Sequence, residues 1–361
     1  MPLEVGIVGL PLVGKTTLFN ALTAAGAEAT AYTKASTKPN VGIARIDDAR
    51  LREINQYIAT ERIVPATIQV VDVAGLARSA DGGSNKFLAH IRDMDALLHV
   101  VRCFRSDQVP HVDGSIDPIR DVDTVETELI YADFEQVTAA LDRARRAAKS
   151  GEREAIARLE LLEKALAGLN QGKPVRDLAV SPEQQKLIRS MGLLTNKKVL
   201  TVANVGEDDI HGRGEVVQKL RERCAQAGSP VVAICAKLEA EIVELPESDR
   251  SEMLRAMGLS EPALSVLARE AYRLLGLQSF FTAGPKEIRA WTIPIGATAP
   301  QAAGAIHTDF ERGFIRAEIY TLDDLRQYKT EAAIKAAGRM RVEGKNYVMK
   351  DGDITHFLFN V

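Results

Sequence analysis

The stretch from Gly9 to Thr16 reads GLPLVGKT and matches the pattern G-x-x-x-x-G-K-[ST] in full. A short apolar run at residues 5–8 precedes it, and a pattern typical of a helix follows from Thr17. In this setting the glycines let backbone N–H groups turn toward phosphate oxygens, and the helix N-terminus adds partial positive charge. We expect Lys15 to reach the terminal phosphates and the Thr16 hydroxyl to hold Mg²⁺. The stretch therefore predicts a site for a nucleoside triphosphate.

The composition is that of an ordinary soluble globular protein. The chain has 361 residues, enough for two or three domains, with 46% hydrophobic and 26% charged residues. Its formal net charge of −3 excludes a global basic field. Any contact with nucleic acid must therefore come from a local patch.

Cysteine usage and the lengths of the apolar runs indicate a protein of a reducing compartment. Cys103, Cys224 and Cys235 have a spacing that fits neither a disulfide framework nor a zinc site, so we expect small buried side chains. No apolar run approaches the ~20 residues of a membrane span, and residues 1–10 are expected to form a first strand rather than a leader. We expect a cytoplasmic protein that makes no membrane contact.

Strand-like apolar runs recur along the chain, and most are separated by segments with helical spacing. This alternation is typical of an α/β fold in which a mostly parallel sheet carries helices on both faces. The runs lie at residues 4–8, 68–73, 97–102, 198–203 and 230–235.

Residues 133–194 interrupt this alternation. Two apolar stripes with helical spacing, at 134–144 and 156–169, flank a turn near Gly151 and predict an antiparallel helical hairpin inserted between two strands. Around this turn six basic residues outnumber three acidic ones, which favours a phosphate-rich partner, although a solvated face explains any single residue. These residues are Arg143, Arg145, Arg146, Lys149, Arg153 and Arg158 against Asp142, Glu152 and Glu154.

The pattern changes again from about residue 278. Alternating segments at 287–293 and 315–320 predict strands, a short helix is expected near 299–307, and residues 347–357 predict two strands joined by an Asp-Gly turn. We expect a small α+β module here. The predicted domains are a nucleotide-binding domain (1–132 and 195–277), a helical arm (133–194) and a C-terminal domain (278–361).

A second nucleotide motif closes the strand near residue 72. The run Val70-Val71-Asp72 ends in D-x-x-G, with Gly75 as the glycine. An aspartate at this place can hold a water on Mg²⁺, and the glycine N–H can sense the γ-phosphate. The motif is weak alone but informative about sixty residues after a phosphate loop.

A third motif begins at Asn204, where a guanine-specific GTPase would carry Asn-Lys-x-Asp. The acid is Glu207, one methylene longer than aspartate, and Val205 replaces the lysine whose stem would cover the base. A lost charged hydrogen bond costs ~1.5–3 kcal/mol, so guanine preference should be weak. Asn204 can still bond adenine at N7 and the 6-amino group, although a plain polar turn is the alternative. Ala236, which ends another strand, is expected to place its N–H against the base.

Four motifs in order, the helical hairpin and the tail segments at 280–284, 289–292 and 307–311 resemble the YchF family of Obg-like ATPases over essentially the whole chain. The resemblance implies a Ras-like P-loop domain, a coiled-coil insertion and a C-terminal TGS domain of β-grasp type. It implies ATP hydrolysis in preference to GTP and binding to ribosomes, with contacts that include rRNA, by a protein expected to be a monomer. The residues expected to bind the nucleotide are Leu12, Val13, Gly14, Lys15, Thr16, Thr17, Asp72, Gly75, Asn204, Val205, Glu207 and Ala236.

The chain departs from the family pattern near the phosphates. Leu12 stands where members usually carry the asparagine that helps related GTPases hold an activating potassium ion. In the switch segment at 34–40, Ser36 aligns with the threonine that contacts Mg²⁺, and Thr37 is an alternative ligand. The glycine-rich stretch at 78–85 is shortened. The chain is therefore identified as a divergent member.

A group that orients the attacking water is also needed. Leu76 stands where Ras-like enzymes place glutamine, and it cannot bond a water. His111, in a loop, matches a family position to which a catalytic role is attributed, and an imidazole can orient or deprotonate water. His99, inside an apolar strand, is expected to be structural. We predict catalytic roles for Lys15 and His111, with slow turnover that depends on a partner.

Two alternatives stay open. The first is an Obg-class GTPase with relaxed base choice. The second is a nucleotide-gated RNA or protein adaptor in which hydrolysis is vestigial, an alternative that Leu76 and the altered switch residues support.

Overall fold

The computed structural model describes residues 3–24, 40–73 and 83–360. Ser36, Thr37 and Gly75 of the predicted site, and also Leu76, lie outside this part of the chain. The chain forms two compact units, one of Met1–Gly42 with Gln69–Leu264 and one of Ile43–Ile68 with Ser265–Val361. Within the described part, none of the helices combines the length and apolarity needed to cross a membrane.

The sheet of the first unit confirms the predicted α/β fold. Its six strands are ordered β2-β4-β1-β5-β6-β7, and β1 with β4, β1 with β5, β5 with β6 and β6 with β7 are parallel pairs. Every residue of β5 is buried, as expected for a strand covered on both faces. The strands are β1 (Glu4–Val8), β2 (Asn40–Arg45), β4 (Thr67–Asp72), β5 (Ala96–Arg102), β6 (Lys198–Asn204) and β7 (Val231–Ile234).

Helices follow the strands of this unit and bury their apolar stripes. Cys224 and Cys235 are buried and Cys103 is half-buried, and all three are free thiols. Burial raises the pKa of the Cys103 thiol to about 12, which keeps it protonated. The helices are α1 (Lys15–Ala24), α3 (Gly83–Asp93), α7 (Glu215–Gln226), α8 (Ala236–Glu244) and α9 (Glu247–Ala256), and α10 (Ala263–Leu274) continues into the second unit.

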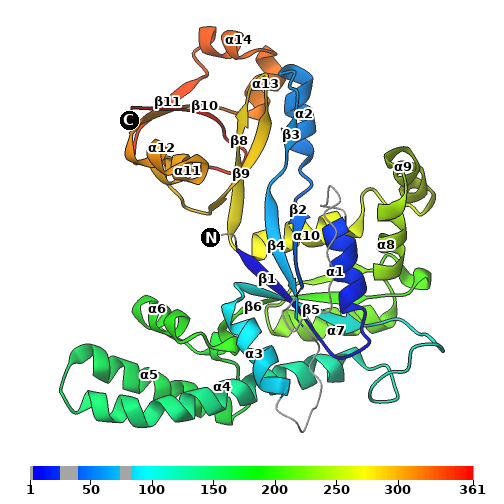
Figure 1. Cartoon of the computed structure of the whole chain (residues 1–361), viewed down its shortest axis with the longest axis vertical. Helices are drawn as coiled ribbons and strands as arrows, with labels where there is room; N and C mark the ends of the chain where they lie inside the picture. Colours follow the sequence, from blue (N-terminus) through cyan, green and yellow to red (C-terminus); the bar gives the residue numbers. More distant parts are fainter. Residues whose placement is uncertain (1–2, 25–39, 74–82, 361) are drawn as a thin grey trace. The chain divides into compact units, whose positions relative to one another are not determined.

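The predicted helical hairpin is present as α4 (Pro118–Ala148) and α5 (Arg153–Asn170), which run side by side in Figure 1. Their core includes Val137, Leu141 and Leu161, and α6 (Pro182–Met191) adds Ile188 to it. The hairpin begins before residue 133, because α4 starts just after Asp117, whose side chain accepts a hydrogen bond from the N–H of Arg120. The helix α4 thus begins within the predicted nucleotide-binding domain and continues without a break into the arm.

The second unit is built on another six-stranded sheet, ordered β11-β10-β12-β8-β9-β3. In Figure 1, α11 and α12 lie against the sheet, and the core between them includes Phe280, Ile293 and Ala302. The strands are β3 (Ile63–Val64), β8 (Leu277–Ala283), β9 (Ile288–Pro294), β10 (Phe314–Tyr320), β11 (Arg341–Glu343) and β12 (Ile354–Phe359). The helices are α2 (Ala49–Tyr57), α11 (Ala299–Ile306), α12 (Thr308–Arg312), α13 (Leu322–Tyr328) and α14 (Glu331–Ala336).

Two expectations for this unit are corrected. The sequence predicts residues 43–68 as part of the nucleotide-binding domain, but β3 pairs with β9 and α2 is bonded to the C-terminal residues, so the second unit is larger than 278–361. Arg50 on α2 pairs with Asp351 at 2.7 Å, and Arg326 on α13 pairs with Glu53 at 2.6 Å. The first of the two strands predicted at 347–357 is absent, because Val348 makes only an isolated bridge to Thr298.

Candidate nucleotide-binding site

The loop between β1 and α1 has the backbone of a phosphate cradle. Gly9 and Gly14 have φ angles of +148° and +95°. A Cβ atom at Gly9 would lie 2.4 Å from the carbonyl oxygen of Val100, and one at Gly14 would lie 2.3 Å from Nδ2 of Asn204. Only glycine fits at either position, which explains the glycine spacing of the motif.

Lys15 reaches back over this loop. Its Nζ donates to the carbonyl oxygens of Gly9 at 3.1 Å and Leu10 at 2.7 Å, and the residue is 8% exposed. Burial lowers the pKa of Lys15 to about 8, and the charge of Asp72 opposes this shift. An ammonium group has three donors, so one remains for a phosphate oxygen.

Two oxygen ligands of the kind that Mg²⁺ prefers meet beside the loop. The Thr16 hydroxyl lies 3.1 Å from Oδ2 of Asp72 and donates to it. These side chains come from the start of α1 and the end of β4. A hydroxyl and a carboxylate so close together fit an octahedral oxygen site completed by water and phosphate.

Asn204 joins the phosphate loop to the strand ends where the base is expected. Its Nδ2 donates to the carbonyl oxygen of Val13 at 2.8 Å, and its Oδ1 accepts from the N–H of Ala236 at 3.1 Å. The N–H of Ala236 is therefore bonded within the protein and is not free for the base, contrary to expectation. The Asn204 amide keeps one N–H and one lone pair for a ligand.

A cavity of about 560 Å³ opens beside Asn204. Six predicted residues line it, although most of the Val205 side chain is packed in the core. They are Gly14, Thr17, Asn204, Val205, Glu207 and Ala236. Lys237 forms an ion pair with Glu207 at 2.8 Å. The remaining lining residues are Phe104, Arg105, Ser106, Gln108, Val109, Gly206, Asp208, Cys235 and Lys237.

Five of these lining residues lie in the loop after β5, which motif reasoning did not include. Arg102 fixes the conformation of this loop: the residue is 2% exposed, and its guanidinium donates to the carbonyl oxygens of Phe104, Val109 and Pro110. It also lies 4.5 Å from the centroid of the Phe104 ring. An arginine ending a strand that is apolar apart from His99 was the available signal, because a buried cation needs several acceptors.

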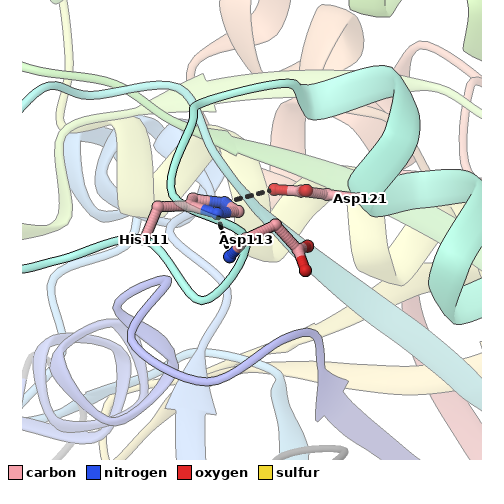
Figure 2. A group of neighbouring side chains, drawn as sticks. All are labelled: His111, Asp113 and Asp121. Carbon is pink, nitrogen blue, oxygen red and sulfur yellow. Dashed lines mark hydrogen bonds and ion pairs between the residues drawn. The ribbon is translucent and has the colours of Figure 1, made fainter.

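His111 follows in the same loop but points into the protein. Figure 2 shows its ring against Asp121 of α4. The distance between Nε2 of His111 and Oδ2 of Asp121 is 2.9 Å. Nδ1 accepts from the N–H of Asp113 at 3.1 Å. The side chains of His111 and Asp121 are 4% and 2% exposed. Both ring nitrogens are thus occupied, and the predicted catalytic residue does not present either one to a ligand in this conformation.

The remaining predicted residues of the phosphate loop differ in exposure. Leu12 is 54% exposed and has a left-handed backbone, with φ of +62°. Val13 is buried, and its carbonyl oxygen accepts the hydrogen bond from Asn204.

His99, on β5, is buried, and burial together with the charge of Lys15 lowers its pKa to about 4.

Comparison with known families agrees with this site. Residues 4–133 match a model described as 50S ribosome-binding GTPase. Residues 277–360 match a model named YchF-GTPase_C, described as a protein of unknown function.

Relatives match over the full length. The chain is 46% identical to the Ribosome-binding ATPase YchF of Escherichia coli O157:H7 and 45% identical to that of Bacillus subtilis, in each case over all of both chains. A solved structure of the Schizosaccharomyces pombe YchF GTPase is 33% identical, with a TM-score of 0.88 over 99% of this chain and 98% of that chain. The chain belongs to the YchF family.

Proposed function

We propose that this chain hydrolyses ATP to ADP and phosphate and acts as a ribosome-associated P-loop NTPase. The observation that carries the proposal is the phosphate loop with Lys15 folded over it and the Thr16–Asp72 pair beside it. Full-length relatives at 46% identity are named ribosome-binding ATPases. Phosphoryl transfer needs positioning and charge neutralisation more than covalent chemistry, and these groups can supply both.

Thr16 would hold Mg²⁺ through its hydroxyl and Asp72 through a water on the ion, and Ser36 or Thr37 would add a ligand from outside the described part. When bound, the ion neutralises charge on the β- and γ-phosphates. Lys15 contributes its remaining N–H donor to the same oxygens. Gly14 of the phosphate loop and Thr17 of α1 line the base cavity.

The base cavity favours ATP at least as much as GTP. Glu207 stands where a guanine-selecting aspartate would be, and its carboxylate already accepts a hydrogen bond from Lys237. A guanine ligand would have to displace this ion pair to gain the bonds of its N1–H and 2-amino groups. Adenine makes no such demand, because it lacks both donors.

His111 is the candidate for orienting the attacking water. A general base must come within hydrogen-bond reach of the water, so His111 has to leave Asp121 before it can act. Slow basal turnover that a partner accelerates is the expected consequence.

The arm tip is our candidate for a contact with rRNA. Near the turn, Nε of Arg146 donates to the carbonyl oxygen of Asp142, and the Arg145 side chain is 57% exposed beside Asp142 and Glu163. A basic surface at the end of a long helical pair suits a phosphate backbone. We infer that the chain works as a monomer on the ribosome in the cytoplasm.

Cosedimentation with ribosomes in ATP, ADP or a non-hydrolysable ATP analogue tests the proposal. We expect sedimentation to depend on the nucleotide and the dependence to vanish in Lys15→Ala, because that change removes a phosphate contact. Single-turnover hydrolysis on ribosomes separates this function from a nucleotide-gated adaptor, which would sediment without cleaving ATP.

Competition of ATP and GTP for one labelled nucleotide tests base choice, and it addresses the GTPase alternative that the S. pombe relative's description keeps open. Glu207→Asp should improve GTP binding and Glu207→Gln should not, because only the first keeps an acceptor with a charge. A tenfold preference of the wild type for GTP would contradict the proposal.

A further inference from the structure

The loop between β5 and α4, residues 103–117, contributes residues both to the base cavity and to the surroundings of His111. Its first half lines the base cavity through Phe104, Arg105, Ser106, Gln108 and Val109. Its second half carries His111, which is tied to α4. One segment of chain therefore joins the base site to the residue proposed to orient water.

A single buried guanidinium ties the two halves together. Arg102 donates to the carbonyl oxygens of Phe104 and Val109, which belong to lining residues, and to that of Pro110, which precedes His111. A bound base that shifts the backbone at Phe104 or Val109 would therefore move or break bonds next to His111. The bonds of Arg102 make this coupling physical rather than a matter of sequence proximity.

The His111 ring is held by two hydrogen bonds whose directions define its protonation. Nδ1 accepts from the Asp113 N–H, so Nε2 carries the proton and donates to the Asp121 carboxylate. Asp121 is 1% exposed and stands in the first turn of α4. A bond from an imidazole to a buried carboxylate is among the stronger neutral-donor bonds, because its acceptor is charged.

Asp121 is compensated by arginine rather than by a metal ion. His111, Asp113 and Asp121 offer ligand atoms within 4.8 Å of one another. However, Nη2 of Arg120 lies 3.2 Å from Oδ1 of Asp121, and its Nε lies 3.6 Å from Oδ2 of Asp113. A divalent cation would have to displace this guanidinium. The cluster is better explained as a set of residues that hold the His111 imidazole in a buried position.

We propose that Asp121 is a positioning residue that holds His111 buried and inactive, and that a nucleotide in the base cavity shifts the loop and weakens this hold without abolishing it. This inference rests on the proposed role of His111 in hydrolysis. Asp121 touches no reacting atom in this scheme; it sets how often the imidazole is available.

Chemical modification of His111 tests, without an activity measurement, whether Asp121 keeps the imidazole inaccessible. Diethyl pyrocarbonate modifies accessible, unprotonated histidine, and peptide mass spectrometry reports each site in the full-length protein. Without nucleotide, His111 should react much more slowly than His307, whose side chain is 61% exposed. Asp121→Asn should raise the rate at His111 roughly tenfold or more, because it removes a charged acceptor, and the ATP analogue should raise it in the wild type.

Asp113→Asn is the matched control. It removes a carboxylate of the same Arg120 cluster but keeps the backbone N–H that binds Nδ1 of His111. The modification rate at His111 should stay near that of the wild type. Equal rates in wild type and Asp121→Asn, or an equal rise in both variants, would overturn the proposal.

Turnover separates this proposal from the role of His111 itself. Asp121→Asn should raise basal kcat several-fold and reduce the stimulation by ribosomes, and the double variant with His111→Ala should behave as His111→Ala alone. A turnover in His111→Ala equal to that of the wild type would refute the catalytic role of His111. The modification rates would still show whether Asp121 keeps the His111 ring buried. A fall of kcat in a folded Asp121→Asn protein, as deep as in His111→Ala, would show that the carboxylate activates His111 and would overturn the proposal.

Discussion

At the scale of single residues, Lys15 makes ATP binding depend on pH. Its pKa is lowered to about 8 in the folded protein, whereas phosphates beside it favour the charged form. Above pH 8 the free protein must take up a proton on binding, so ATP affinity should be nearly constant below pH 8 and fall as the pH rises above it. Calorimetric titration between pH 6.5 and 9.5 measures this effect.

Lys15→Arg is the control for that profile, because a guanidinium stays charged throughout this range. Its affinity for ATP should be weaker but should not decline above pH 8. Parallel profiles in the two proteins would mean that another group titrates.

Leu12 affects both the backbone strain of the phosphate loop and the dependence of hydrolysis on the monovalent cation. A residue with a Cβ atom in the left-handed region costs about 1–2 kcal/mol, and asparagine tolerates that region better than leucine. Because the side chain is 54% exposed, Leu12→Asn should gain about 1 kcal/mol of unfolding free energy and should acquire potassium stimulation of hydrolysis. The wild type should hydrolyse ATP equally fast in potassium and sodium. Leu12→Ala keeps the strained Cβ and offers no ligand, so it should gain neither property.

His111 and His99 should respond differently to the same substitution. His111→Ala should lower turnover on ribosomes, by at most ~10²–10⁴-fold if it transfers a proton, with little change in ATP affinity, because the contact forms only near the transition state. His99→Ala should lower the melting temperature, since His99 is buried in β5. Saturating-ATP kinetics and thermal melting measure the pair, and an unchanged kcat in His111→Ala would assign water orientation to another group.

At the scale of elements, the root of the arm depends on Asp133. This carboxylate is buried in α4 and accepts from the N–H groups of Leu194 and Thr195 and from the Thr195 hydroxyl. Asp133→Asn replaces one acceptor by a donor that faces another donor, which should cost about 1–3 kcal/mol of unfolding free energy. Asp142→Asn, at an exposed site in the second half of the same helix, should change it by less than about 0.5 kcal/mol. Urea unfolding compares the two, and equal losses would deny Asp133 this role.

The elements also show what a single sequence can reveal. The phosphate loop and the parallel strands were predictable because their signals are local: glycines at fixed spacing and fully apolar runs. Residues 104–109 were not predictable as cavity lining, because their position depends on how buried Arg102 folds the loop. Asp121, too, is ten residues from His111 in sequence. No sequence motif indicates that an aspartate at this spacing holds a histidine ring in a buried position.

At the scale of the whole molecule, the second unit needs residues 43–68. The α2 side chains Leu51 and Ile54 are buried, and burying each contributes about 1.5–3 kcal/mol, a large share of the stability of a small domain. Residues 265–361 alone should therefore melt at a much lower temperature than a single chain in which a flexible linker joins 43–68 to 265–361. Circular dichroism against temperature measures both proteins, and identical cooperative melting would show that 43–68 is dispensable.

The same division of the chain has a consequence during protein synthesis. Residues 43–68 leave the ribosome early, but the strand and helices that pair with them, β9 and α13, are translated near the end of the chain. At ~5–20 residues per second, α2 and β3 wait on the order of ten seconds to a minute for these partners. Throughout that time Leu51 and Ile54 lack the neighbours that bury them. The nascent chain should therefore be a client of chaperones that bind short apolar segments, even though the first unit has already begun to fold.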